Sequence, residues 1–312
     1  MHRYRFILFR PLQFLPVLFG ISAITFVLVR LIPGDPARIL LGTRATPTAI
    51  ANIRAQYGLD EPMWVQYLYF LKNLGAGEMG KSTLYKIDVL RLIATRIEPT
   101  LALVATGVVL ALLIAVPFAA ISARRQGTLA DHAVRVVSTA GIGFPSFWLG
   151  AMLIILFSVK LDWLPVSGYG ETLGEKLTHL VLPGLTIALS LSAVLTRSLR
   201  AGMVAGLGSD IATAARARGM PEGVVFWRHV VPNALVPTVN LLAVNIGWLI
   251  GGTVVVESVF AIPGLGQLMV RGIFSRDYMV VQGVALAFAC ATVLINFAAD
   301  IITVALDPRV EM

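Results

Sequence analysis

Six long stretches of the sequence contain no Asp, Glu, Lys or Arg and are rich in apolar side chains. Each stretch runs 19 to 27 residues. An α-helix rises 1.5 Å per residue, so about 20 residues cross the hydrocarbon core of a bilayer. A helix also pairs its own backbone polar groups, which lipid cannot do. The pattern therefore predicts an all-α polytopic membrane protein with six transmembrane helices, at Pro11–Val29, Thr100–Ala123, Val136–Val159, Leu177–Thr196, Val230–Val256 and Tyr278–Ala299.

The composition agrees with this pattern. Hydrophobic residues make up 57% of the 312 residues and charged residues 13%, whereas a soluble domain carries about a quarter charged residues. The net charge of +8 would also suit nucleic acid, but the basic residues are spread along the loops, so membrane orientation explains them and we expect no nucleic-acid partner. Cys290 is the single cysteine, which excludes an intrachain disulfide and a cysteine-based metal site. The four histidines are scattered, and the sequence predicts no catalytic residues, no bound cofactor and no metal.

The distribution of Lys and Arg predicts the orientation. With the first residues inside, the short inner segments hold twelve of the 25 basic residues and the short outer loops hold four. Short loops rich in Lys and Arg stay in the cytoplasm, so both termini are predicted to be cytoplasmic. The first span resembles a signal peptide, but no small-x-small cleavage site follows it, so we interpret it as a retained anchor.

These predictions divide the chain into four parts. Residues 1–30 form a cytoplasmic leader with the first transmembrane helix, and residues 31–98 form an external connection with surface helices. Residues 99–305 form a five-helix core that includes a cytoplasmic loop at 200–232, and residues 306–312 form a cytoplasmic tail.

The stretch Gly75–Ser82, GAGEMGKS, matches the phosphate-binding pattern G-x-x-x-x-G-K-[ST]. It lies in the predicted external connection, where there is no ATP. A phosphate-binding loop follows a strand, but the residues before this one place Trp64, Leu68 and Leu71 at helical spacing. We therefore interpret the match as a turn that joins two surface helices, and not as a nucleotide site.

The loop between the fourth and fifth predicted spans has the signals of a helix, a break and a second helix. Ser209 or Asp210 suits the start of the first helix, and Gly219 suits the position just beyond its end. Pro221 suits the first turn of the second helix, in which Val224, Val225, Trp227 and Val231 are predicted to line one apolar face. Such a helix fits a groove on a soluble partner, or it is an amphipathic connector that rests on lipid headgroups.

The same loop resembles the EAA motif of permease subunits in bacterial ABC importers. That motif reads E-A-A, three residues, G, nine residues, I-x-L-P. Ala214, Ala215, Gly219 and Pro232 match it in register, while Thr213 replaces its Glu. His229 and Val231 replace its Ile and Leu, and the run from Ala214 to Gly219 with the following Arg-His resembles the variant of the peptide-permease branch.

The resemblance covers nearly the whole chain and points to the dipeptide, oligopeptide and nickel importer branch. Further similar segments lie at Leu31–Pro36, Tyr57–Pro62, Phe144–Trp148, Trp163–Pro165, Glu257–Phe260, Pro263–Gly266, Arg276–Tyr278 and Asp307–Arg309. The resemblance implies a type I ABC importer permease fold, in which this loop is the coupling helix that sits in a cleft of an ATPase subunit. It thereby implies an ATPase-coupling set of Thr213, Ala214, Ala215, Arg218, Gly219, Pro221, Glu222, Trp227 and Pro232.

The resemblance also implies partners. These are a second homologous permease, two cytoplasmic ATPase subunits that bind ATP and Mg²⁺, a periplasmic or lipid-anchored substrate-binding protein, and the lipid of the bacterial inner membrane. The expected cargo is a di- or oligopeptide, with nickel complexes, glutathione and opine-like solutes as alternatives. A more remote alternative is a self-sufficient secondary transporter, which usually shows internal repeats.

Polar side chains at lipid depth are costly and usually face a pathway or a partner helix. On this basis Asn240, Asn245, Glu257 and Asn296 are candidates for the translocation path. Hydrogen bonding between helices is the alternative for all four. Arg197 and Arg200, at the inner end of the fourth predicted span, are interpreted as interfacial anchors.

Overall fold

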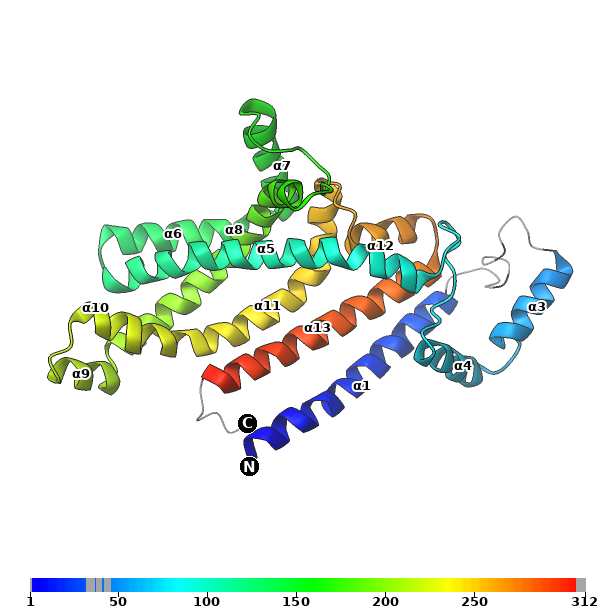
Figure 1. Cartoon of the computed structure of the whole chain (residues 1–312), viewed down its shortest axis with the longest axis horizontal. Coiled ribbons are helices and arrows are strands. Elements are labelled where there is room, and N and C mark those ends of the chain that lie inside the picture. The colour runs from blue at the N-terminus through cyan, green and yellow to red at the C-terminus, as the bar shows by residue number, and fades with distance from the viewer. Residues whose placement is uncertain (1, 32–36, 38–40, 42–45, 307–312) are drawn as a thin grey trace.

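The computed structural model describes residues 2–31, 37, 41 and 46–306, and this part of the chain is almost entirely helical (Figure 1). The long helices are α1 (His2–Leu31), α5 (Val89–Arg124), α8 (Leu173–Leu207), α11 (Val231–Val259) and α13 (Tyr278–Leu306). The shorter helices are α3 (Pro47–Tyr57), α4 (Met63–Gly75), α6 (Leu129–Gly143), α7 (Ser146–Leu153), α9 (Asp210–Ala217), α10 (Glu222–Val225) and α12 (Leu265–Phe274). π-Helical turns at Ile154–Lys160 and Phe226–Val230 extend α7 and α10.

Four continuous helices are long and apolar enough to cross a membrane, at Val89–Arg124, Leu173–Leu207, Glu222–Val259 and Tyr278–Val304. They correspond to the second, fourth, fifth and sixth predicted spans. The first predicted span falls in α1, where the apolar helical segment Phe14–Leu28 is shorter than these four. The all-helical membrane architecture is therefore confirmed, while the predicted number of six spans is not. Of the segments that carry the family resemblance, Asp307–Arg309 and most of Leu31–Pro36 lie outside the described residues, as does nearly all of the predicted tail 306–312.

The third predicted span, Val136–Val159, is not one straight helix. It is divided into α6 and the helix Ser146–Lys160, which meet at an angle of 105°. Phe144 has extended backbone angles (φ −91°, ψ 130°), and Pro145 follows it. A proline disfavours helical geometry at the residue before it and has no N–H to donate, so the helix ends there. The bent pair is equivalent to at most one span.

The bundle is built around α5 and α8, which pack along most of their lengths, with α11 beside α8, α13 beside α11 and α1 beside α13. Small residues allow the close approach of α5 and α8. A Cβ atom added at Gly107 of α5 would lie 2.7 Å from Ile187, and one added at Gly184 of α8 would lie 2.7 Å from Thr106. Small residues of this kind let helices in lipid pack backbone against backbone.

One end of the bundle gathers the functional candidates. The end of α5, the start of α6, the end of α8 and the pair α9–α10 all lie at the left of Figure 1, while α4 and α12 lie towards the opposite end. The start of α1 and the end of α13 lie at the same end as α9 and α10. We refer to this end as the coupling end.

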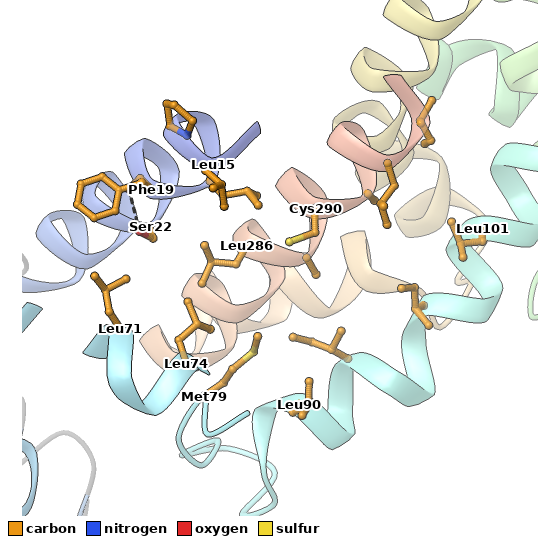
Figure 2. Close-up of a pocket in the computed structure, with 18 residues that line it drawn as sticks. Leu15, Phe19, Ser22, Leu71, Leu74, Met79, Leu90, Leu101, Leu286 and Cys290 are labelled. Carbon is orange, nitrogen blue, oxygen red and sulfur yellow. Dashed lines mark hydrogen bonds between the residues drawn. The ribbon is translucent and has the colours of Figure 1, made fainter. Parts of the chain in front are cut away.

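An apolar groove of about 1030 Å³ lies between α1, α4, α5 and α13 (Figure 2). The polar lining residue Ser22 is already hydrogen-bonded: its hydroxyl donates to the Phe19 carbonyl oxygen and contacts the Tyr67 hydroxyl at 2.7 Å. The free thiol of Cys290 lies on its wall. The groove is lined mostly by apolar side chains, which suits contact with lipid tails, and no charged residue lines it.

Candidate functional site

The turn from α8 to α9 is fixed by Ser209. Its hydroxyl accepts a hydrogen bond from the Ala212 N–H and donates one to the Gly206 carbonyl oxygen at 2.7 Å. Serine at this position satisfies an otherwise unpaired N–H at the start of a helix. The sequence offered Ser209 or Asp210 as the cap, and the structure selects Ser209.

The break after α9 is formed by Gly219, whose φ is +77°. Its N–H donates to the Arg216 carbonyl oxygen, and the Met220 N–H donates to the Ala215 carbonyl oxygen. Glycine has no Cβ and so adopts this left-handed conformation without steric cost. The prediction of a glycine-terminated helix is confirmed here.

Arg216 holds the whole break together. Its guanidinium donates to the Leu207 carbonyl oxygen at 3.0 Å, and its Nε donates to Glu222 Oε1 at 2.7 Å. A single side chain on α9 thus joins the last turn of α8 to the first residue of α10. Sequence reasoning did not identify this role, because nothing in the sequence places Leu207 beside Glu222.

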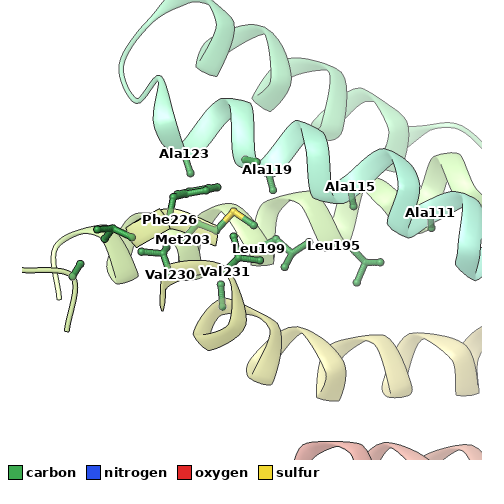
Figure 3. Close-up of a cluster of buried hydrophobic side chains, with 14 of the residues drawn as sticks. Ala111, Ala115, Ala119, Ala123, Leu195, Leu199, Met203, Phe226, Val230 and Val231 are labelled. Atoms are coloured by element: carbon green, nitrogen blue, oxygen red, sulfur yellow. The ribbon is translucent and has the colours of Figure 1, made fainter. Parts of the chain in front are cut away.

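The buried side of α10 and of the π-helical turn anchors the site to the bundle (Figure 3). Val225, Phe226 and Val230 are each at most 1% exposed and pack in a cluster with residues of α5 and α8. On α5 this cluster uses Ala111, Ala115, Ala119 and Ala123, and on α8 it uses Leu195, Leu199 and Met203. The Arg124 guanidinium lies over the Phe226 ring, 5.4 Å from its centroid.

The predicted apolar face of this second helix is partly wrong. Val225 and Val231 are buried as expected, but Val224 is 42% exposed and Trp227 is 53% exposed. Val224 and Trp227 lie three residues apart on the exposed side of the helix, and the opposite side packs against α5 and α8. The π-helical turn at Phe226–Val230 shifts the phase of the residues that follow, and Val231 is buried with that side. Phe226 and Val230 therefore occupy the buried face.

The outer surface of α9 and α10 presents small and apolar groups together. Thr213, Ala214, Gly219 and Pro221 are exposed there. Exposed apolar side chains flank them, at Ile211, Val224 and Trp227. Beside Trp227, a hollow of about 660 Å³ runs to the end of α5. A helical projection with exposed apolar side chains between charged ones fits a cleft on a soluble protein.

The structure brings the predicted coupling set together at this end. Arg218 and Glu222 are exposed, and Pro232 is exposed at the start of α11. Ala215 differs, because it is 4% exposed and packs inward with Ala212. The predicted surface is therefore the exposed set without Ala215, which supports it from beneath.

Glu257 lies deep inside the chain. It is 0% exposed, Thr100 Oγ1 donates to its Oε1 at 2.7 Å, and the Gln267 N–H donates to its Oε2 at 2.9 Å. A Cβ atom added at Gly264 would collide with the carboxylate, so the first turn of α12 is folded tightly around it. A carboxylate at a helix start pairs with the free N–H groups there. This position favours hydrogen bonding between helices, the alternative to a place on the translocation path.

The three asparagines of the predicted path are half-buried or exposed. Asn240 is exposed and its Oδ1 accepts a hydrogen bond from the Thr303 hydroxyl at 2.9 Å, which joins α11 to α13. Asn245 and Asn296 donate to carbonyl oxygens four residues earlier in their own helices. The structure does not gather these three side chains and Glu257 into one cluster.

A buried ion pair at the coupling end was missed by sequence reasoning. Asp131 of α6 is 1% exposed, and Arg200 of α8 donates to it through Nε and Nη2, both at 2.7 Å. The Ser122 hydroxyl of α5 and the Gly127 N–H also donate to the Asp131 carboxylate. Arg200, interpreted from the sequence as an interfacial anchor, instead ties three helices together.

The stretch Gly75–Ser82 forms a turn that is pinned to the start of α13. The Ser82 hydroxyl and the Leu84 N–H both donate to Asp277 Oδ2, at 2.5 and 3.0 Å. Ser82 is buried, whereas Lys81 is exposed. The segment before it is the helix α4, not a strand. The stretch is thus a structural turn, and the hydroxyl of its motif serine, Ser82, is already hydrogen-bonded to the Asp277 carboxylate.

The two motif residues are expected to respond differently to substitution. Lys81→Ala should change the free energy of unfolding by less than about 0.5 kcal/mol, because its side chain is exposed. Ser82→Ala should cost about 1 to 3 kcal/mol, because the buried Asp277 carboxylate loses a donor. Chemical denaturation in detergent measures both. Equal losses, or ATP binding by the purified chain that Lys81→Ala abolishes, would contradict the assignment as a turn.

The described residues contain no cluster of three or more His, Cys, Asp or Glu side chains that could hold a metal ion. They form a helix bundle with the exposed surface of α9 and α10 at one end.

Two family models match the chain. Residues 115–312 match the model described as "Binding-protein-dependent transport system inner membrane component". Residues 3–104 match the model of the N-terminal part of a binding-protein-dependent transport system membrane component.

Curated relatives match along nearly the whole length. The chain is 37% identical over 313 residues to the oligopeptide transport system permease protein AppB of Bacillus subtilis (strain 168), covering 98% of this chain and 99% of that protein. It is 36% identical over 306 residues to the glutathione transport system permease protein GsiC of Escherichia coli (strain K12), with 98% of each chain covered.

Among solved structures, the inward-facing MetNI methionine ABC transporter matches with a TM-score of 0.57 and 19% identity, over 69% of this chain and 96% of that one. An amino acid ABC transporter with histidines matches with a TM-score of 0.52 and 15% identity, over 68% of this chain and 93% of that one. These two likenesses concern the fold.

Proposed function

The chain belongs to the family of binding-protein-dependent transport system inner membrane components, and on that premise we propose that it forms half of the translocation path of an ATP-driven importer for di- or oligopeptides. It is a permease subunit and not itself an enzyme. ATP and Mg²⁺ are bound by two separate ATPase subunits, and a second permease completes the path. A periplasmic or lipid-anchored binding protein delivers the cargo.

The observation that carries this proposal is the rigid projection of α9 and α10. Gly219 and Arg216 fix the angle between the two helices, and Phe226 holds the second one in the cluster with α5 and α8. A push on the exposed surface at Ala214, Pro221 and Trp227 is therefore transmitted to the bundle without first bending the projection. Binding of ATPase subunits in different nucleotide states then shifts the bundle between its conformations.

A stripe along α11 is the best candidate for the wall of the path. Exposed residues recur every three or four positions, and the stripe mixes polar with apolar side chains: Asn233, Pro237, Asn240, Val244, Trp248, Gly251, Val255 and Ser258. Between Leu101 and Ile121, by contrast, every exposed side chain of α5 is apolar, and the large ones are Leu101, Val109, Leu113, Phe118 and Ile121. Exposed polar side chains at lipid depth are costly, so the α11 stripe suits water or a second permease better than lipid tails.

The cargo class rests on the two relatives. One is a permease of an oligopeptide system and the other of a glutathione system, and both match the chain over nearly its full length. Glutathione is itself a tripeptide, so a short peptide is the class common to both. Selectivity among peptides, nickel complexes and opine-like solutes is assigned to the separate binding protein.

Reconstitution of the complete importer tests this function. The chain is tagged in its own cells, and the complex is purified in mild detergent and placed in liposomes with ATP at the face that carries the ATPases. Uptake of a labelled dipeptide, of a longer peptide and of glutathione is then measured with the binding protein added. At least one of these solutes should accumulate, and only with ATP.

The chain alone in liposomes is the control. It should neither accumulate any of the three solutes nor hydrolyse ATP. Uptake by the chain alone, driven by an ion gradient, would contradict the proposal and identify a self-sufficient secondary transporter instead. ATP-dependent uptake that does not require the binding protein would contradict the proposed division of selectivity.

A further inference from the structure

A basic pocket of about 270 Å³ lies between α6 and α8, near the coupling end of the bundle. Three arginines line it: Arg135 of α6, and Arg197 and Arg200 of α8. The hydroxyl residues Ser138, Thr139 and Thr196 also line it, and its lining includes no Asp or Glu. Neither the translocation path nor the docking surface described above uses this pocket.

The positive charge of the pocket is not neutralised within the described part of the chain. Arg200 forms an ion pair with the buried Asp131 carboxylate. Arg135 and Arg197 are exposed, and neither forms an ion pair with a described residue. Two guanidinium groups beside hydroxyl side chains are a set of donors that suits the oxygen atoms of a phosphate.

The order of residues along both helices matches an amphiphile. On α6, Arg135 lies nearer the coupling end and Ile142 lies seven residues deeper, about 10 Å along the helix. On α8, which runs towards the coupling end, Arg197 and Arg200 lie nearer that end and Ala193 lies deeper. The neighbouring flank of α6 is apolar and open, with Val136 68% and Val137 60% exposed.

We propose that this pocket binds the phosphate headgroup of an anionic phospholipid, with an acyl chain lying along the apolar flank of α6. Basic pockets between helices near the membrane surface recognise such headgroups. A small polar anion uses the arginines but has no group to contact Ile142 at the deep end of the pocket or Val137 on the neighbouring flank. The lipid would hold α6 against α8 beside the Asp131–Arg200 pair.

Lipid retention tests the proposal. The full-length chain is purified in a neutral detergent, and phosphatidylglycerol or phosphatidylcholine is added at equal concentration. Native mass spectrometry then counts the lipids that stay bound. The wild-type chain should retain phosphatidylglycerol at least about tenfold better, and the double variant Arg135→Gln/Arg197→Gln should lose most of that preference, since each arginine near the membrane surface contributes several-fold to anionic lipid binding.

The matched control is the double variant Arg125→Gln/Arg228→Gln. It removes the same charge at the same end from two exposed arginines that do not line this pocket. It should keep the wild-type preference. All four substituted side chains are exposed, so circular dichroism should report the same helix content for every variant.

Competition separates a lipid from a soluble anion. Inorganic phosphate and a dipeptide with a free carboxylate should each fail to displace phosphatidylglycerol at concentrations where dioctanoyl phosphatidylglycerol succeeds. Displacement by the dipeptide but not by its C-terminal amide would overturn the proposal and assign the pocket to a peptide carboxylate. Equal retention of the two lipids by the wild-type chain, or an unchanged preference in Arg135→Gln/Arg197→Gln, would also overturn it.

Discussion

Replacing Arg200 by alanine is expected to lower the free energy of unfolding by about 3 to 5 kcal/mol. The substitution leaves the Asp131 carboxylate, 1% exposed, with only the Ser122 hydroxyl and the Gly127 N–H as donors. Removing one partner of a buried pair is costly because the remaining charge has neither water nor a counterion. The three helices α5, α6 and α8 should loosen together at the coupling end.

Denaturation in a phospholipid-free detergent, followed by circular dichroism, measures this loss. Arg197→Ala is the matched control, since it removes an exposed arginine three residues earlier on α8, and it should change the free energy of unfolding by less than about 0.5 kcal/mol. If Arg200→Ala does not fold, Arg200→Lys serves instead. Lysine keeps the charge but loses the bidentate hydrogen bonds to Asp131, so the free energy of unfolding should fall by less than in Arg200→Ala. A shared loss for Arg197→Ala and Arg200→Ala would show that the buried pair is not what matters.

The double variant Asp131→Leu/Arg200→Met completes this test. Replacing both charges by apolar side chains removes the unpaired group, so the double variant should be more stable than Arg200→Ala. If the loss in the double variant equals the sum of the losses in Asp131→Leu and Arg200→Met, a direct interaction between Asp131 and Arg200 is contradicted.

Replacing Ala214 by arginine is expected to reduce transport and cargo-stimulated ATP hydrolysis of the assembled importer by at least about tenfold. Ala214 is exposed on α9, in the middle of the proposed docking surface, so a long charged side chain there would hold the ATPase away. The fold of the chain itself should not change, because the added side chain points to solvent and clashes with nothing in the bundle.

Uptake by liposomes and ATP hydrolysis by the same complex measure this effect. Ala133→Arg on α6 is the control, since it places the same side chain at another exposed alanine of the coupling end and should leave both rates near those of wild type. Normal transport by Ala214→Arg would remove α9 from the docking surface. A loss of rate that is matched by unfolding of the chain would instead assign Ala214 to stability.

Local signals in the sequence predicted much of the candidate site. Ser209 and Gly219 act through atoms within a few residues of themselves, so the start and the end of α9 could be read from the order of residues. Four of the apolar, charge-free stretches likewise coincide with long helices, because an apolar side chain must meet lipid or core wherever the helix lies.

Contacts between distant residues could not be predicted in this way. Arg200 was interpreted as an anchor at the membrane surface, yet it pairs with Asp131, which lies 69 residues away in the sequence. Glu257 was a candidate for the path, yet it is enclosed by Thr100 and the first turn of α12. The sequence gives the charge of each side chain but not the helix that comes to face it.

Contacts between distant residues also determine which side of α10 and its π-helical turn is buried. Helical spacing placed Trp227 with Val225 and Val231 on one face, but Phe226 is buried and Trp227 is exposed. Phe226 packs in one buried cluster with the alanines of α5 and with Leu199 and Met203 of α8.

The order of residues was enough to predict a helical membrane protein with a break between two helices at Gly219, because those features depend on spans of apolar residues and on the backbone preferences of Ser, Gly and Pro. The packing of the helices sets which side chains of the break are exposed, the hydrogen bonds of the buried Glu257 and Asp131, and the pocket that Arg135 and Arg197 share. Burial and charge pairing depend on which residues are neighbours in space, and in a bundle those neighbours come from different helices.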